Sequence, residues 1–264
     1  MEHCTLVSTT DTVKKLITMI SNKCTGFYLR FGDGDFNIVE GKHDMLAVPT
    51  INFQHWMIET MKISDDSVMT CIPHHCTKLN TLEIGMFLGN HEYGFESVQK
   101  FINTLTKIRN KIPNILYTNV ALSYCSSHDP DLVVKLHKEI KKHQVVYIGN
   151  NIYSNEFIKK LFGSTVDRIN TSSRDSYLEH DIILDQFDKL YHEKYEINNF
   201  FIIIMAAGCG GRAFSGELYY KYYQKKQNFF ILDYGSLLDF LWGYNSRAYM
   251  DLDPPNTEYI MNSI

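Results

Sequence analysis

The feature that most constrains the fold of this chain is a run of apolar residues near its C-terminus, Phe200–Ala207. The run is continuous rather than alternating, which is typical of a strand that helices cover on both faces. It has the length of a strand and falls well short of the roughly 20 apolar residues that span a bilayer. A strand of this kind predicts a parallel sheet inside an α/β domain.

Shorter β-rich runs alternate with amphipathic helical stretches along the rest of the chain, with no linker or internal repeat between them. We therefore predict a single Rossmann-like α/β domain over residues 1–264, with a mostly parallel central sheet and helices on both faces. The predicted strands are Gly26–Phe31, Met45–Val48, Val68–Ile72, Ile115–Val120, Val145–Gly149, Thr165–Ile169, Asn199–Ala207 and Asn228–Tyr234. The predicted helices are Thr12–Ser21, Phe53–Ile63, Thr81–Leu88, Gly94–Lys111, Pro130–His143, Ser154–Phe162, Arg174–Tyr195 and Ala213–Gln227.

Charge and cysteine usage exclude several function classes. The 264 residues carry a formal net charge of −4, so the chain lacks the basic character of a nucleic-acid-binding protein. Its six cysteines and 11 histidines show no zinc-binding spacing, which favours reduced thiols in a cytosol-like compartment. The N-terminus has neither the basic nor the apolar region of a signal peptide. We therefore expect a cytoplasmic protein with no nucleic-acid partner and no membrane span.

A polar motif follows the first predicted strand. The segment Arg30-Phe31-Gly32-Asp33-Gly34-Asp35-Phe36 places two carboxylates two positions apart, between glycines that allow a sharp turn. Carboxylate oxygens suit Mg²⁺ or Mn²⁺, ions that usually also bind substrate phosphates. We therefore predict that Asp33 and Asp35 hold a divalent cation, with Arg30 available to a phosphate. Two alternatives are an ordinary Asp/Gly surface turn and a loop in which Arg30 neutralises both carboxylates.

Other candidates also follow predicted strands, and ligands of open α/β sheets bind at the carboxyl ends of the strands. The glycine-rich segment Gly208–Arg212 leads from the buried strand into a helix, where free N–H groups attract phosphate. A connection that needs glycine only for tight packing is the alternative. His74 is a candidate for phosphate contact or proton transfer, Asp239 for a general base, and Gly149 and Asn150 for contact with a base or ribose. The alternatives are a surface histidine and an Asn-rich turn that serves only the backbone conformation.

The motif at Arg30 also resembles the signature of a known family. Arg-Phe-Gly-Asp-Gly followed by an acidic residue is similar to the signature of glycosyltransferases with the GT-D fold, in which an Asp-x-Glu pair binds the metal that holds a nucleotide-sugar diphosphate. Asp35 stands where the usual residue is Glu, which keeps the charge and shortens the reach. Segments that resemble later strand ends of the family are Leu46–Pro49, Met69–Pro73, Ala206–Gly211 and Leu232–Asp239.

This resemblance implies a metal-dependent glycosyltransferase that moves a sugar from a nucleotide-sugar, of the UDP-sugar class, to a hydroxyl group of a glycan or glycoprotein. Mn²⁺ or Mg²⁺ would be held by Asp33 and Asp35, and the catalytic candidates are these two residues together with Asp239 and His74. The candidates for binding the nucleotide-sugar are Arg30, Gly32, Gly34, Gly149, Asn150, Gly208, Gly210, Gly211, Arg212, Asp233 and Ser236.

Two other functions fit parts of the pattern. A nucleotide- or sugar-binding module without turnover would keep the same residues, and the presence of Asp35 in place of Glu leaves this possibility open. Phosphatases of the haloacid-dehalogenase type use Asp-x-Asp-x-Thr/Val after their first strand, but here Asn37 occupies the last position of that pattern. The phosphatase is therefore the weaker alternative.

Overall fold

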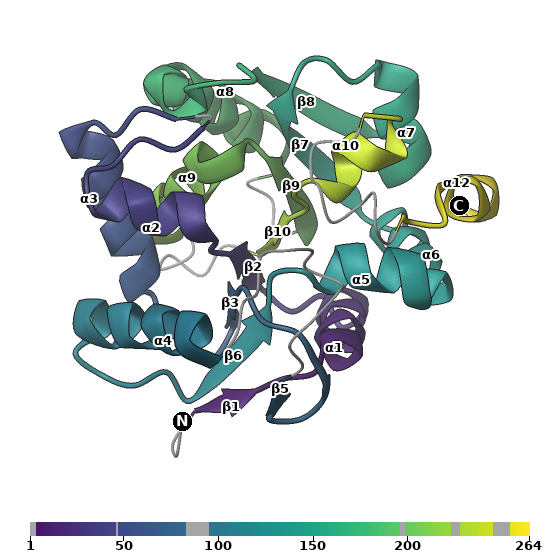
Figure 1. Cartoon of the computed structure of the whole chain (residues 1–264). Coiled ribbons are helices and arrows are strands. Elements are labelled where there is room, and N and C mark those ends of the chain that lie inside the picture. The colour runs from purple at the N-terminus through teal and green to yellow at the C-terminus, as the bar shows by residue number, and fades with distance from the viewer. Residues whose placement is uncertain (1–3, 46, 83–94, 196–198, 223–227, 245–253) are drawn as a thin grey trace.

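A parallel sheet forms the centre of the molecule (Figure 1). The computed structural model describes residues 4–45, 47–82, 95–195, 199–222, 228–244 and 254–264. Within these residues the sheet has eight strands in the order β1-β6-β3-β2-β10-β9-β7-β8, and every neighbouring pair is parallel. The strands are β1 (Thr5–Leu6), β2 (Gly26–Arg30), β3 (Val68–Ile72), β6 (Ile115–Thr118), β7 (Gln144–Asn150), β8 (Val166–Thr171), β9 (Phe201–Ala206) and β10 (Phe229–Asp233), while β4 (Cys76–Lys78) and β5 (Thr81–Leu82) form a separate antiparallel pair.

Strands β2 and β10 meet at the point where the strand order reverses. From β2 the chain passes outward to β3 and then to β6, whereas on the other side it reaches β7 and β8 first and returns through β9 to β10. In open α/β sheets this reversal opens a crevice beyond the carboxyl ends of the strands, and ligands bind there. The topology therefore directs attention to the residues that follow β2, β9 and β10.

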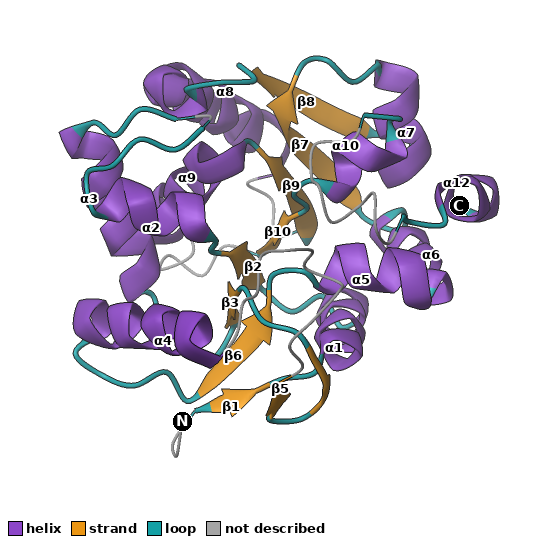
Figure 2. Ribbon diagram, viewed as in Figure 1, coloured by secondary structure: helices purple, strands orange, loops and turns teal. Residues whose placement is uncertain are grey.

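Helices cover both faces of the sheet (Figure 2). Because successive residues of a strand point to opposite faces, β9 sends Phe201, Ile203 and Met205 into one core cluster and Ile202 and Ile204 into the other. No helix in the described segments combines the length and the apolar character needed to cross a membrane. The helix layer on the first of these faces consists of α2 (Asp33–Val39), α3 (Ile51–Lys62), α4 (Phe95–Arg109), α8 (His180–Leu190), α9 (Gly208–Lys221) and the short helical turns η2 (Ser176–Glu179) and η3 (Tyr191–Tyr195). The layer on the second face consists of α1 (Thr9–Ser21), α5 (Ala121–His128), α6 (Pro130–Ile140), α7 (Asn155–Phe162), α10 (Leu237–Leu241) and α12 (Thr257–Ser263).

The predicted α/β class with a mostly parallel sheet between helices is confirmed, and several local predictions need correction. The described residues of the predicted strand Met45–Val48 form no regular strand, and Ala47 makes only an isolated bridge to Asp44. Thr81–Leu82 belong to β5 rather than to a helix, and residues 83–88 of that predicted helix lie outside the described residues.

Both glycine-containing motifs begin helices instead of forming open loops. Helix α2 starts at Asp33, because the Asp35 carboxylate accepts a hydrogen bond from the N–H of Gly32 and so caps the first turn. Helix α9 starts at Gly208, five residues before the predicted Ala213, and the predicted residues 223–227 lie outside the described part. The N–H groups of both first turns therefore point toward the carboxyl edge of the sheet.

A buried histidine connects α6 with the residue that follows β10. Nδ1 of His137 donates to the carbonyl of Leu161 at 2.9 Å, which leaves Nε2 to accept from the Tyr234 hydroxyl at 2.7 Å. The side chain is fully buried, and burial lowers the pKa of His137 to about 4. The imidazole is therefore neutral in the folded protein at physiological pH.

This histidine predicts a loss of stability in mild acid. Between pH 6.5 and about 4 the unfolded chain protonates His137 and the folded chain does not, so the stability that this residue contributes falls as the pH falls. The full difference corresponds to roughly 3 kcal/mol. We expect the unfolding free energy of the native chain, measured in urea from pH 7 to pH 4, to fall by about that much more than the value for His137→Gln. If the unfolding free energies of the native chain and of His137→Gln fell equally with pH, His137 would not be buried in its neutral form.

Candidate active site

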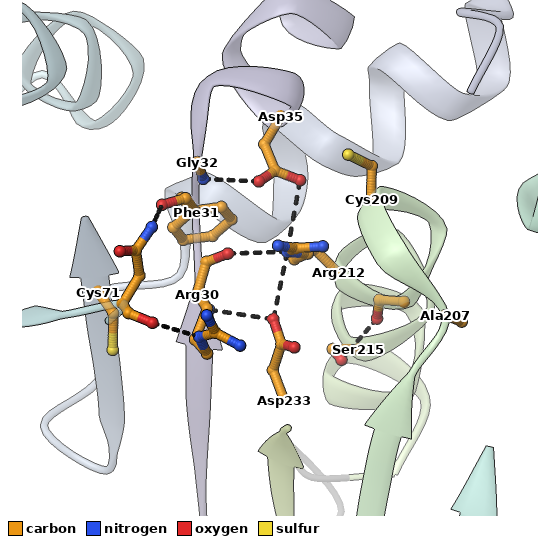
Figure 3. A network of polar contacts seen from close by, with 12 residues as sticks. Arg30, Phe31, Gly32, Asp35, Cys71, Ala207, Cys209, Arg212, Ser215 and Asp233 are labelled. Atoms are coloured by element: carbon orange, nitrogen blue, oxygen red, sulfur yellow. Dashed lines mark hydrogen bonds and ion pairs between the residues drawn. The ribbon is translucent and has the colours of Figure 1, made fainter. Parts of the chain in front are cut away.

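An arginine lies between two buried carboxylates at the carboxyl edge of the sheet (Figure 3). The Nε atom of Arg212 is 3.2 Å from Oδ2 of Asp233 and 3.4 Å from Oδ1 of Asp35. It also donates a hydrogen bond of 2.8 Å to the carbonyl oxygen of Arg30. Asp35 is 1 % exposed and Asp233 is 4 % exposed, so the cluster is largely removed from water. We call Asp35, Arg212 and Asp233 the ion-pair cluster.

The topology of the sheet brings these three residues together. Asp233 is the last residue of β10, Asp35 lies in α2 directly after β2, and Arg212 lies in α9 directly after β9. These three strands are neighbours, with β10 in the middle. The backbone N–H of Arg30, at the end of β2, also donates to Oδ2 of Asp233 at 3.3 Å, which joins the two central strands.

The electrostatics of the cluster favour a further positive or hydrogen-bonding group. Oδ2 of Asp35 accepts from the N–H of Gly32 at 2.7 Å, but its buried Oδ1 atom has no hydrogen-bond partner. Burial raises the pKa of Asp35, an effect that the charge of Arg212 only partly offsets. Although burial lowers the pKa of Arg212, the charges of Asp233 and Asp35 hold it above its ordinary value. One guanidinium therefore serves two carboxylates.

A further carboxylate, Asp44, lies close to this cluster, and the sequence pattern did not identify it. A Cβ atom at Gly34 would lie only 2.6 Å from Oδ1 of Asp44 and 3.0 Å from Sγ of Cys209, so a side chain at this position would displace one of them. Burial, followed by the charge of Asp35, raises the pKa of the Cys209 thiol well above its ordinary value. The thiol therefore remains protonated and is no nucleophile at neutral pH.

The two motif carboxylates differ in their surroundings. Asp33 is exposed at the first position of α2, whereas Asp35 is buried two residues later. Two positions turn a helix by about 200°, so the side chains leave the helix on different sides. Helical side chains tilt toward the N-terminus, and Asp35 does reach back to Gly32 there. The space before the first turn of α2 is therefore the region that both carboxylates can share.

Arg30 has a structural role in the contacts that the structure describes. Its guanidinium donates to the carbonyl oxygens of Asn119 at 2.5 Å and Tyr234 at 3.1 Å, and the residue is 8 % exposed. Arg30 thus ties the ends of β6 and β10 to β2. The arginine that pairs with the Asp35 carboxylate is Arg212, and not Arg30 as the alternative interpretation of the motif expected.

The glycines at the start of α9 have two different environments. A Cβ at Gly210 would lie 2.3 Å from Oγ of Ser176, and one at Gly211 would lie 2.7 Å from Cγ of Met205. These two glycines therefore permit close packing. Gly208 is exposed and has a φ of +56°, and a Cβ atom added there would meet no atom within 4 Å. Among the three, Gly208 is the one beside which a ligand has room.

The other predicted site residues are distributed along the same edge. Oδ1 of Asn150 accepts from the N–H of Ile152 at 3.1 Å, and Asp239 accepts from the Tyr153 hydroxyl. His74 is fully buried with its Nδ1 3.5 Å from Sγ of Cys76, and burial lowers the pKa of this imidazole to about 4. Gly149 packs against Tyr147 and Ala206, and Ser236 precedes α10.

The parallel sheet and the site at its carboxyl edge were compared with solved protein structures. The chain has the fold of solved structures of the domain of unknown function 1792, one of which is described as a distinct glycosyltransferase fold, and the predicted GT-D type is thereby confirmed. A structure described as a new glycosyltransferase from Streptococcus sanguinis is similar with a TM-score of 0.60 and 16 % identity, over 95 % of this chain and 92 % of that one. The structure described as the distinct fold has a TM-score of 0.59 and 12 % identity, over 96 % and 90 %. No family model matches the sequence, and no curated protein matches it.

Proposed function

We propose that this chain is a glycosyltransferase that transfers a sugar from a nucleotide-sugar, of the UDP-sugar class, to a hydroxyl group of a glycan or glycoprotein acceptor. The observation that carries the proposal is the ion-pair cluster, which lies where β2, β10 and β9 end, in a chain whose fold is that of known glycosyltransferase structures. We further propose a cytoplasmic location, because none of the six cysteines forms a disulfide.

The residues at the start of α2 fit a divalent cation, Mn²⁺ or Mg²⁺, as part of this proposal. Asp33 offers an exposed carboxylate, and Asp35 offers its buried Oδ1 atom, which lies 3.4 Å from Nε of Arg212 and accepts no hydrogen bond. Within the described residues no three His, Cys, Asp or Glu side chains form a metal-binding group, so water and substrate phosphates would complete the coordination. When bound, the ion would neutralise charge on the departing diphosphate.

The protein groups around this position would bind and orient the donor. The first turn of α9 presents backbone N–H groups, and a helix start attracts phosphate. Exposed Gly208 leaves space for that approach, and the guanidinium of Arg212 adds positive charge at the same helix. Asp35 and Asp233 hold Arg212 in place, so the charge is oriented before the donor arrives.

A thermal-shift panel of nucleotides and nucleotide-sugars, each with and without Mn²⁺, tests the proposal. A ligand at about 100 times its dissociation constant stabilises the fold by roughly 2.7 kcal/mol. We expect one nucleotide-sugar to raise the Tm with Mn²⁺, and we expect Asp33→Asn/Asp35→Asn to abolish that increase. Glu217→Gln is the matched control, because it also neutralises a carboxylate, and Glu217 accepts a hydrogen bond from the Tyr177 hydroxyl rather than belonging to the proposed metal site.

The outcome of this panel separates the proposal from its alternatives. Release of the diphosphate only when an acceptor is present establishes transfer. Stabilisation by a nucleotide-sugar without turnover against any acceptor favours a binding module, and release of free phosphate from phosphate monoesters favours a phosphatase. If the double variant unfolds without ligand while the control stays folded, the carboxylates serve the fold rather than the donor.

A further inference from the structure

An exposed tryptophan stands at the end of α10. Trp242 is 41 % exposed, although its indole ring is held by two aromatic neighbours. The ring centroid lies 4.9 Å from that of Phe157 and 6.2 Å from that of Tyr153, and the Tyr153 contact is perpendicular. A large apolar ring that is fixed in place and still open to solvent is a surface on which another flat or ring-shaped group can pack.

A carboxylate accompanies this ring. Asp239 precedes Trp242 by three residues, which places both on the same side of the helix. The Tyr153 hydroxyl donates a hydrogen bond to Oδ1 of Asp239, so Tyr153 contacts both residues. Tyr153 is itself held by Arg168, whose Nη1 donates to the Tyr153 carbonyl at 2.7 Å. The three side chains therefore form one fixed group, which we call the aromatic platform (Tyr153, Asp239 and Trp242).

The aromatic platform lies at the same edge of the sheet as the ion-pair cluster but in the other helix layer. Helix α10 begins shortly after Asp233, the end of β10, and Tyr153 follows the end of β7. Trp242 lies six residues beyond Ser236, which corresponds to about 9 Å along a helix. Helices α2 and α9, which carry Asp33, Asp35, Gly208 and Arg212, pack on the opposite face of the sheet. The platform therefore lies at the same edge of the sheet as the starts of α2 and α9, but on the other face.

We propose that the aromatic platform binds a neutral pyranose ring, and, if the proposed function holds, that this ring belongs to the acceptor. The apolar face of a pyranose can pack on the indole of Trp242, while the Asp239 carboxylate accepts hydrogen bonds from ring hydroxyls. The same negative charge repels the phosphates of a nucleotide, which makes a nucleotide the less favourable occupant.

The tryptophan content of the chain offers a direct test without any donor. Trp56 and Trp242 are the two tryptophans, and Trp56→Phe leaves Trp242 as the single indole fluorophore. We would titrate this variant with methyl β-glucoside, methyl β-galactoside, methyl N-acetyl-β-glucosaminide and UMP. A saturable change in Trp242 emission with at least one glycoside is expected. Trp242→Phe, which keeps Trp56, is the matched control and should show no change.

The second variant tests the role of the carboxylate. Asp239→Asn should weaken the glycoside response at least fivefold in dissociation constant while far-ultraviolet circular dichroism stays unchanged. A response to UMP alone, or to none of the four compounds, would overturn the inference. Glycoside binding combined with a failed donor panel would support the platform and refute the transferase. Confirmed transfer with an acceptor KM that Trp242→Phe leaves unaltered would refute the platform alone.

Discussion

Replacing Arg212 with methionine is expected to destabilise the fold by about 3–5 kcal/mol, because it leaves two buried carboxylates without their cation. Asp35 and Asp233 are 1 % and 4 % exposed, so water cannot take the place of the guanidinium. The loss of the hydrogen bond to the Arg30 carbonyl adds to the effect. Urea unfolding at pH 7 would measure it, as a large drop in the midpoint with little change in slope.

A triple variant separates charge from packing. Arg212→Met combined with Asp35→Asn and Asp233→Asn removes the uncompensated charges, so we expect it to recover at least half of the lost stability. Arg109→Met is a useful comparison, since Arg109 is a half-buried arginine that donates to the carbonyls of Met61 and Ile63 and to no carboxylate among the described contacts. A triple variant no more stable than the single one would show that the charges of the ion-pair cluster are not what Arg212 offsets.

The sheet was predictable from the sequence because its strands carry local signals. The β3 strand was predicted with its observed bounds, Val68–Ile72, and the apolar runs of β9 and β10 were recognised to within two residues at each end. Continuous burial on both faces demands continuous apolar sequence, so the pattern and the structure have the same cause. The gathering of polar residues at one edge then follows from parallel pairing alone.

The partners within the site were not predictable, because they depend on contacts between distant segments. Arg30 stands close to Asp35 in sequence, yet the cation that pairs with Asp35 is Arg212, from the far end of the chain. Asp44 reaches Gly34 through a loop held by an isolated bridge, for which no periodic pattern exists. Glycine is likewise unfavourable within a helix, so helix propensity does not predict that α9 starts at Gly208. That start depends on tertiary packing.

Substitution of Gly235 by alanine is expected to cost at least about 4 kcal/mol, the sum of a backbone penalty and lost hydrogen bonds to a charged group. Gly235 follows β10 with a φ of +66°, a conformation that costs an alanine roughly 1–2 kcal/mol. A Cβ atom there would also lie 1.4 Å from Nη1 of Arg30. The guanidinium would have to leave the carbonyls of Asn119 and Tyr234, and hydrogen bonds to a charged group are worth about 1.5–3 kcal/mol each.

Gly208→Ala is the matched control for this substitution, because Gly208 has a similar φ of +56° and no atom within 4 Å of the new Cβ. It should cost only the backbone term of roughly 1–2 kcal/mol. In the background of Arg30→Met the clash is reduced, so Gly235→Ala should lose at least about 1 kcal/mol less stability than it does in the native chain, as a double-mutant cycle from urea unfolding would show. Equal losses at Gly235 and Gly208, or additive effects of the Gly235 and Arg30 substitutions, would mean that Arg30 does not fill the space above this turn.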